Sequence, residues 1–235
     1  LADKFGNVIH LGERDCSVQR KNQKMVEEAP CIVISDELRE AIGNDAVAAA
    51  KAVGYENAGT IEFLLDKDGN YYFMEMNTRI QVEHPVTEMV TGIDIVKQQV
   101  LIAAGHKMQY AQADVKILGH AIECRINAED ASNGFRPSPG KINSLHIPGG
   151  NGVRVDSFLY QGYSVPPHYD SMLAKLIVYA TTRDEAIMKM KRALGEFVVD
   201  GVITNVDYHF QIMENNVYKS GLYDTGFIEN SMGVD

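Results

Sequence analysis

Two β-rich segments joined by a short turn constrain the fold of this chain most strongly. Residues 59–66 (GTIEFLLD) and 71–77 (YYFMEMN) are rich in β-branched and aromatic residues. The residues that connect them, 66–70 (DKDGN), have the composition of a tight turn. This pattern predicts an antiparallel β-hairpin.

Two glutamates are expected to face each other within this hairpin. If Asp66 pairs with Tyr71, Glu62 lies opposite Glu75, with the two side chains roughly 5 Å apart. Side chains alternate between the faces of a strand, so Asn77 points to the same side as Glu75. Opposed carboxylates destabilise a sheet unless a cation neutralises them, and an oxygen-only ligand set favours Mg²⁺ or Mn²⁺ over zinc. The spacing therefore predicts a divalent metal site. The alternative is a hairpin with an acidic, solvated face.

A dense polar segment follows the hairpin, where a buried chain would place apolar residues. Arg79, Gln81 and Glu83 occupy every second position, so an extended segment would project all three to one side. His84 precedes Pro85, which favours an extended backbone at His84, and we interpret it as a structural histidine. The composition of this segment is typical of a reaction site.

Composition limits the classes of protein to consider. With 235 residues and 45% apolar content, the chain can bury one large core or two small ones. The net charge of −10 is spread over both halves, which argues against a nucleic-acid surface. No apolar run approaches the roughly 20 residues that span a bilayer, so we expect no membrane association. Cys16, Cys31 and Cys124 are widely spaced, which predicts free thiols in a reducing cytoplasm.

The other segments divide into predictable elements and one ambiguous stretch. We expect helices over 35–53, 95–104, 182–199 and 206–214, a strand over 119–127, short strands between 135 and 169, and a frayed tail over 221–235. Asn205 is expected to cap the last helix. Residues 13–28 alternate charged and neutral side chains and are too polar for a core strand, which leaves a solvated loop as one interpretation. A boundary is expected between residues 116 and 117.

Three motifs in the same order resemble one family. Residues 75–88 (EMNTRIQVEHPVTE), 12–30 (GERDCSVQRKNQKMVEEAP) and 119–130 (GHAIECRINAED) resemble the biotin carboxylases, the ATP-grasp enzymes of biotin-dependent carboxylases. The resemblance implies an α+β fold. Residues 1–116 would be the C-terminal portion of an ATP-grasp domain, an antiparallel sheet with packed helices. Residues 117–235 would be a biotin carboxylase C-terminal domain of short antiparallel strands and two helices.

The resemblance also implies a reaction, cofactors and partners. The family carboxylates biotin on a biotin carboxyl carrier protein, using ATP and bicarbonate by way of carboxyphosphate, and in acetyl-CoA carboxylase this is the first half-reaction of fatty acid synthesis. ATP, two Mg²⁺ or Mn²⁺ ions and carrier-bound biotin are the expected ligands. The expected partners are the carrier protein, a carboxyltransferase and a second copy of the chain, contacted through residues 149–154. Because the chain begins at Leu1, halfway through an apparent strand pair, we expect a C-terminal fragment that lacks the phosphate lid and is inactive alone.

The family pattern assigns roles to the residues around the hairpin. Glu62 and Glu75 would bind the metal and the nucleotide, with Asn77 as a further metal ligand. Bicarbonate would be gripped by Arg79 and deprotonated by Glu83, because a carboxylate base within hydrogen-bond reach activates this weak nucleophile. Gln81 and the backbone N–H of Val82 would donate the remaining hydrogen bonds.

Four residues outside the hairpin complete the implied site. Gln19 and Asn22 would contact the nucleotide, although most members of the family have histidine where Asn22 stands. Lys24 would be a cation beside bicarbonate and the phosphates. Arg125 would stabilise the enolate oxygen of the biotin ureido ring, since a guanidinium stays charged and offers a planar fork of donors. The alternative for Arg125 is a structural ion pair.

Other functions stay open at this point. Ligases of the carbamoyl-phosphate synthetase type use a similar metal hairpin but carry proline where this chain has Thr78. Pyruvate carboxylases tend to have HTVTE where residues 84–88 read HPVTE, which favours an acyl-CoA branch, with propionyl-CoA and methylcrotonyl-CoA carboxylases as further alternatives. A non-enzymatic alternative is an inert module for dimerisation or carrier docking.

Overall fold

The computed structural model describes residues 1–233, which form an α+β structure of two compact units. Unit 1 comprises residues 1–14 and 29–118. Unit 2 comprises residues 15–28 and the chain from Gly119 onward. The chain therefore enters unit 2 twice, while the domain division at residue 116 inferred from the sequence stays a prediction.

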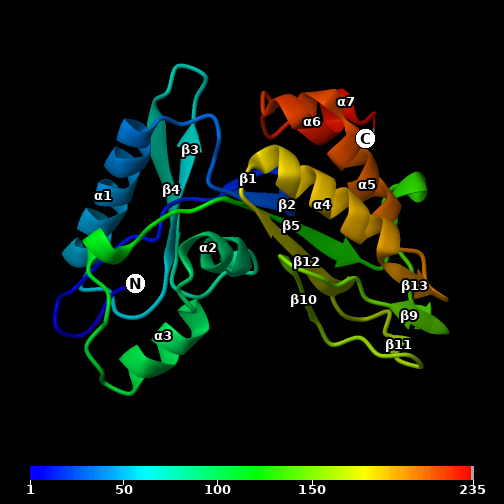
Figure 1. Ribbon diagram of the computed structural model, residues 1–235, viewed down its shortest axis with the longest axis horizontal. Coiled ribbons are helices and arrows are strands. Elements are labelled where there is room, and N and C mark those ends of the chain that lie inside the picture. Colours follow the sequence, from blue (N-terminus) through cyan, green and yellow to red (C-terminus); the bar gives the residue numbers. More distant parts are fainter. Residues whose placement is uncertain (234–235) are drawn as a thin grey trace. The chain divides into compact units, whose positions relative to one another are not determined.

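Unit 1 is built around the predicted hairpin. It consists of α1 (Asp36–Ala52), β3 (Thr60–Leu65), β4 (Tyr71–Asn77), α2 (His84–Thr91), α3 (Ile95–Ala103) and a 3₁₀ turn, η1 (Gln112–Asp114). Helix α1 lies beside the hairpin, and the Tyr71 hydroxyl donates to an Asp45 carboxylate oxygen at 2.7 Å (Figure 1). The expected helix starts are confirmed, because the side chains of Ser35 and Asp94 accept backbone N–H groups of the first turns of α1 and α3.

Unit 2 contains an antiparallel five-stranded sheet with the order β1-β2-β5-β12-β10. Its strands are β1 (Asp15–Arg20), β2 (Gln23–Ala29), β5 (His120–Asn127), β12 (Met172–Ala180) and β10 (Val153–Ser157). Two-stranded pairings join β6 (Glu129–Asp130) to β7 (Arg136–Pro137), β8 (Gly140–Lys141) to β11 (Ser164–Val165), and β9 (Ser144–His146) to β13 (Val198–Asp200). The helical segments are η2 (Ala131–Asn133), α4 (Arg183–Glu196), α5 (Val206–Glu214), α6 (Asn216–Ser220) and α7 (Phe227–Ser231).

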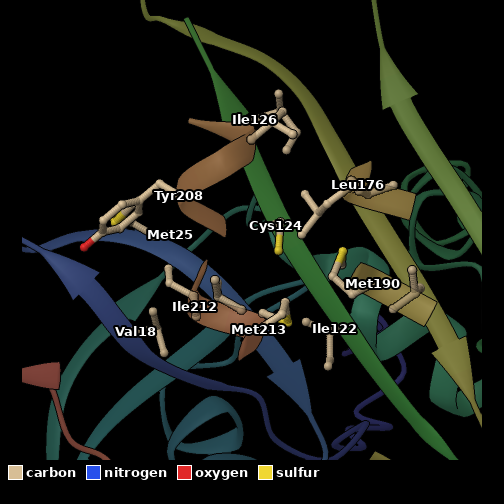
Figure 2. Close-up of a cluster of buried hydrophobic side chains, with 14 of the residues drawn as sticks. Val18, Met25, Ile122, Cys124, Ile126, Leu176, Met190, Tyr208, Ile212 and Met213 are labelled. Carbon is tan, nitrogen blue, oxygen red and sulfur yellow. The ribbon is translucent and has the colours of Figure 1, made fainter. Parts of the chain in front are cut away.

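The main core of unit 2 lies between one face of this sheet and helices α4 and α5 (Figure 1). Figure 2 shows side chains of four strands and both helices packed together: Val18, Met25, Ile122, Cys124, Ile126, Leu176, Met190, Tyr208, Ile212 and Met213. In β5, Ile122, Cys124 and Ile126 face this core, because side chains alternate between the two faces of a strand. Burial raises the pKa of the Cys124 thiol well above its usual value, and all three cysteines are free, as predicted.

Two expectations about unit 2 were wrong. Residues 15–28 form two strands of the sheet rather than a solvated loop, although Glu27 and Glu28 are both buried there. The frayed tail expected from residue 221 contains helix α7, whose Phe227 and Ile228 are buried in the core, and residues 234–235 lie outside the described part. Polar strands and a short helix of this kind acquire their order from distant packing partners rather than from local pattern.

Glu28 is the centre of a buried polar cluster that joins four segments of unit 2. Its carboxylate contacts His120 Nε2 on β5 at 2.6 Å and accepts from Arg183 Nε on α4 at 2.7 Å. The Tyr223 hydroxyl also donates to this carboxylate. Burial alone would raise the pKa of Glu28, but hydrogen bonds from His120 and Arg183 and the Arg183 charge outweigh it and lower the pKa to about 2.

Replacing Glu28 with glutamine should weaken the fold at neutral pH. A carboxylate with a lowered pKa contributes stability that is present above its unfolded pKa of 4.5 and is lost as the pH falls towards 2. Glu28→Gln should therefore cost about 3 kcal/mol at pH 7 and flatten the pH dependence of stability between pH 5 and 2. Urea unfolding across this pH range measures both effects. Glu214→Gln, which removes a surface ion pair with Lys191, is the matched control, and equal losses for the two variants would contradict the prediction.

Candidate active site

The hairpin places the two predicted metal carboxylates opposite each other. Glu62 pairs with Glu75, and Thr60 pairs with Asn77, as the sequence predicts. The turn differs from the prediction, because Leu65 rather than Asp66 pairs with Tyr71. A β-bulge next to Glu62 adds one residue to β4 and so returns the strands to the predicted register.

The amide of Asn77 joins the two carboxylates. Its Nδ2 donates to Glu62 Oε1 at 3.2 Å and to Glu75 Oε1 at 3.0 Å. Amide hydrogens therefore lie between two carboxylates of like charge. A cation in the same place would neutralise these charges more effectively. Among the described residues no group of three or more His, Cys, Asp or Glu side chains is arranged for a metal. Asn77 turns its Nδ2 towards the carboxylates and its Oδ1 towards Arg79, so its amide would have to rotate to serve as a ligand. With that oxygen turned inward, two carboxylates and one amide oxygen would suit Mg²⁺ or Mn²⁺, which commonly complete their coordination with water and phosphate oxygens.

The polar segment after β4 bends instead of running straight. Arg79 is exposed and its Nη2 donates to Asn77 Oδ1 at 3.2 Å, whereas Gln81 and Glu83 are 5% and 2% exposed. Residues 82–83 form a turn, and α2 begins at His84, so the predicted extended run and the extended backbone at His84 were wrong. Pro85 lies in the first turn of α2, where its missing N–H group costs no hydrogen bond.

Gln81 is held in a defined orientation. Its Nε2 donates to Glu62 Oε1 at 2.6 Å, while its Oε1 accepts from Arg14 Nη2 at 2.5 Å. Arg14 also donates to the hydroxyls of Thr60 at 3.1 Å and Thr87 at 3.0 Å. Because arginine offers only donors, Arg14 must face the oxygen of the Gln81 amide. The N–H groups of that amide therefore point towards the Glu62 carboxylate. Arg14 was missed by sequence reasoning, since its partners lie 46 to 73 residues away and leave no local signal.

The predicted nucleotide and bicarbonate residues of unit 2 gather at one hairpin. Gln19 on β1 pairs with Lys24 on β2, and the two strands are joined by Lys21 and Asn22. Lys21 and Asn22 have φ angles of 48° and 64°, a pair of left-handed conformations that fits a type I′ turn. Asparagine tolerates this conformation better than most residues, which gives Asn22 a structural reason to stand at the exposed tip.

Arg125 on β5 is anchored to a buried carboxylate. Its Nε and Nη2 approach Glu27 Oε1 at 2.7 Å and 2.5 Å, and Glu27 is fully buried. The ion pair considered as the structural alternative is therefore present. It orients the guanidinium without consuming all of its donors, since five N–H groups are available. Glu27 was not identified from the sequence, because only the pairing of β2 with β5 brings it beside Arg125.

Comparison of the chain with known proteins identifies its family. The family model of the ATP-binding domain of the carbamoyl-phosphate synthase L chain matches residues 1–111, and that of the biotin carboxylase C-terminal domain matches residues 123–230. The chain belongs to the biotin carboxylase family. Biotin carboxylase 1 of Bacillus subtilis is 58% identical to it over 230 residues, which cover 97% of this chain and 51% of that protein.

Relatives named for other carboxyl acceptors have a similar sequence identity to this chain. One of them, from the pyruvate carboxylase of Methanothermobacter thermautotrophicus, is 53% identical over 236 residues, covering 100% of this chain and 48% of that protein. The crystal structure of the biotin carboxylase domain dimer of Hydrogenobacter thermophilus 2-oxoglutarate carboxylase, in complex with MgADP, ADP and bicarbonate, has a TM-score of 0.98 and 51% identity, covering 100% of this chain and 52% of that one. The chain thus spans about half the length of the proteins it matches. No helix within residues 1–233 is long and apolar enough to cross a membrane.

Proposed function

We propose that this biotin carboxylase chain takes part in the ATP-dependent carboxylation of biotin by bicarbonate. The observation that carries the proposal is the pairing of Glu62 with Glu75, bridged by Asn77 and followed by exposed Arg79 and buried Glu83. The crystallised 2-oxoglutarate carboxylase domain, 51% identical to this chain, was obtained with MgADP and bicarbonate, which are the ligands that this arrangement suits.

The residues of unit 1 serve the first step. A bicarbonate oxygen attacks the γ-phosphorus of ATP, ADP leaves, and carboxyphosphate forms. Glu62, Glu75 and Asn77 would hold Mg²⁺ or Mn²⁺, which neutralises charge on the phosphates when bound. Arg79 holds the anion by its planar fork of donors, and Glu83 accepts the bicarbonate proton. Gln81, fixed by Arg14, and the backbone N–H of Val82 donate to the remaining bicarbonate oxygens.

The residues of unit 2 serve the nucleotide and the second step. The carboxyl group passes from carboxyphosphate to N1 of biotin, the phosphate that leaves accepts the N1 proton, and inorganic phosphate is released. Arg125 stabilises the negative charge that develops on the ureido oxygen when N1 loses its proton. Lys24 supplies positive charge for bicarbonate and the phosphates, and Gln19 and Asn22 contact the nucleotide.

Biotin carried on a carboxyl carrier protein, and a carboxyltransferase that accepts the carboxyl group, are the proposed partners. The dimer seen in the crystal structure of the 2-oxoglutarate carboxylase domain supports a homodimer, for which we propose the segment 149–154 as a contact. The acetyl-CoA branch is our preferred assignment and rests on residues 84–88 (HPVTE). Similar identities to a pyruvate carboxylase and to a 2-oxoglutarate carboxylase leave the final acceptor to be decided by assay.

An ATP cleavage assay tests the proposal. The full-length protein with ATP, Mg²⁺ and free biotin should release ADP faster when bicarbonate is present, and should form carboxybiotin in step with ADP. An inert dimerisation or docking module would show no cleavage that depends on both bicarbonate and biotin, and that result would overturn the proposal. The same assay on residues 1–235 alone tests the expectation that this segment does not turn over ATP by itself.

A further inference from the structure

Asn205 stands at the N-cap of α5 but does not cap it. Its side chain makes no hydrogen bond to the first turn of the helix, contrary to the sequence prediction. Instead, Oδ1 accepts from the backbone N–H of Asn127 at 2.8 Å, and Nδ2 donates to the carbonyl oxygen of Arg125 at 3.0 Å. Its own backbone N–H donates to the Asn127 carbonyl at 3.1 Å. The residue gives up a helix cap and binds β5 through three hydrogen bonds.

His209, one turn further along α5, contacts the same carbonyl. Its Nε2 lies 2.8 Å from the oxygen of Arg125, and the ring is fully buried. Nδ1 has no hydrogen-bond partner among the described residues, so a proton there would be a buried, unsatisfied donor. Nε2 also lies 3.1 Å from Asn205 Nδ2. In the tautomer that carries its proton on Nε2, His209 donates to the Arg125 carbonyl and Nδ1 is left as a bare acceptor. Burial lowers the pKa of His209 to about 4, although the hydrogen bond to Arg125 opposes this shift, and the ring is neutral at physiological pH.

These contacts fix Arg125 from two directions. Asn205 and His209 hold its main-chain carbonyl from the core side, while Glu27 holds its guanidinium at 2.7 Å and 2.5 Å. A long side chain keeps its tip in place only if its Cα is also fixed, because a small displacement of the backbone moves the donors away from the oxygen they serve.

We propose that Asn205 and His209 are positioning residues for Arg125 that set the place of its guanidinium for transfer of the carboxyl group to biotin. This inference rests on the proposed function, in which Arg125 stabilises the ureido oxygen. The two residues act through the β5 backbone and do not touch substrate, so their effect should be confined to the biotin step.

The experiment compares the two half-reactions in the full-length enzyme. Asn205→Ala and His209→Leu should lower kcat for biotin carboxylation about ten- to hundredfold with little change in KM for biotin, because the donors act mainly on charge that develops in the transition state. Bicarbonate-dependent ATP cleavage without biotin, in which carboxyphosphate decomposes in water, should stay within about twofold of wild type. His209→Gln, whose Nε2 can donate from nearly the same place, should restore most of the biotin step.

The control is Asn215→Ala. Asn215 caps the next helix in unit 2 by accepting from the backbone N–H of Val217 at 2.8 Å, and its side-chain hydrogen bonds within the described residues go to segments other than β5. Its loss should lower the melting temperature, as loss of Asn205 does, without separating the two half-reactions.

Each outcome has one meaning. If Arg125→Gln keeps biotin-dependent turnover, the role given to Arg125 under the proposed function fails. If Arg125→Gln loses it while Asn205→Ala and His209→Leu resemble Asn215→Ala, or slow both half-reactions equally, the positioning role is refuted. Should Asn205→Ala not fold, the two His209 variants decide the question, because a His209→Gln enzyme as impaired as His209→Leu also overturns the inference.

Discussion

Replacing Glu83 with glutamine should slow bicarbonate-dependent ATP cleavage and biotin carboxylation by at least about 100-fold, the size of effect typical of a lost general base. Glutamine has nearly the same shape but cannot accept the bicarbonate proton. Because glutamine fills the space of the buried Glu83 side chain, which is 2% exposed, the fold should be retained, and any loss of stability is seen in the melting temperature. Initial rates at saturating ATP and bicarbonate, together with the melting temperature, measure the two effects separately.

Glu88→Gln is the matched control for this variant. Glu88 lies in the same helix, and its Oε1 accepts from the backbone N–H of Ile95 at 2.8 Å, a bond that a glutamine oxygen can replace. This control should turn over within about threefold of wild type, because no step of the proposed reaction uses Glu88. A Glu83→Gln enzyme as active as the Glu88→Gln enzyme would remove Glu83 from the mechanism and leave the proton acceptor to be found elsewhere.

Neutralising one carboxylate of the hairpin should weaken metal binding and, without metal, stabilise the hairpin. Glu75→Gln is expected to lower Mn²⁺ affinity at least about tenfold, since one of two anionic ligands is lost. In the metal-free protein the same change removes the repulsion between Glu62 and Glu75 and should raise the free energy of unfolding by about 0.2–1 kcal/mol. Calorimetric Mn²⁺ titration and urea unfolding in chelator measure these opposite effects.

The control is Asp66→Asn at the turn of the same hairpin. Asp66 accepts from the backbone N–H groups of Asp68 and Asn70 through one oxygen, which asparagine retains. It removes one negative charge from the hairpin but lies outside the proposed ligand set, so Mn²⁺ affinity should fall less than about twofold. If Asp66→Asn weakens binding as much as Glu75→Gln, the ion is attracted by the general acidity of the hairpin and not held by the paired glutamates.

The parts that local pattern determines were predictable. The alternating residues of β3 and β4 and the turn residues between them predict the hairpin with Glu62 opposite Glu75, although the strands reach this pairing through a bulge at Met74 that was not predicted. Ser35 and Asp94 mark helix starts through bonds that span only three residues. These features depend on the period of the strand and on nearby hydrogen bonds, which a short window of sequence contains.

The parts of the structure that distant contacts determine could not be predicted from the sequence. Glu28 lies in a strand that reads as too polar for a core, and it is buried because His120, Arg183 and Tyr223 come to it from 92 to 195 residues away. Arg14 shows the same limit, because its hydrogen bond to Gln81 closes a loop of 67 residues. Asn205 was predicted incorrectly for a related reason. A local rule identified the start of the helix correctly, but it could not show that the Asn205 side chain hydrogen-bonds to β5 instead of to the helix.

The bulge in β4 affects which changes of length the metal hairpin tolerates. Phe73 pairs with Phe63 and Glu75 pairs with Glu62, so Met74 is the additional residue. Deleting Met74 would give a regular ladder in which the two carboxylates still oppose each other, although with less local twist. With Met74 retained in a ladder without a bulge, Glu75 would turn to the other face. Natural insertions and deletions in this hairpin are therefore expected at position 74 and at the turn, where the carboxylate pairing can survive them.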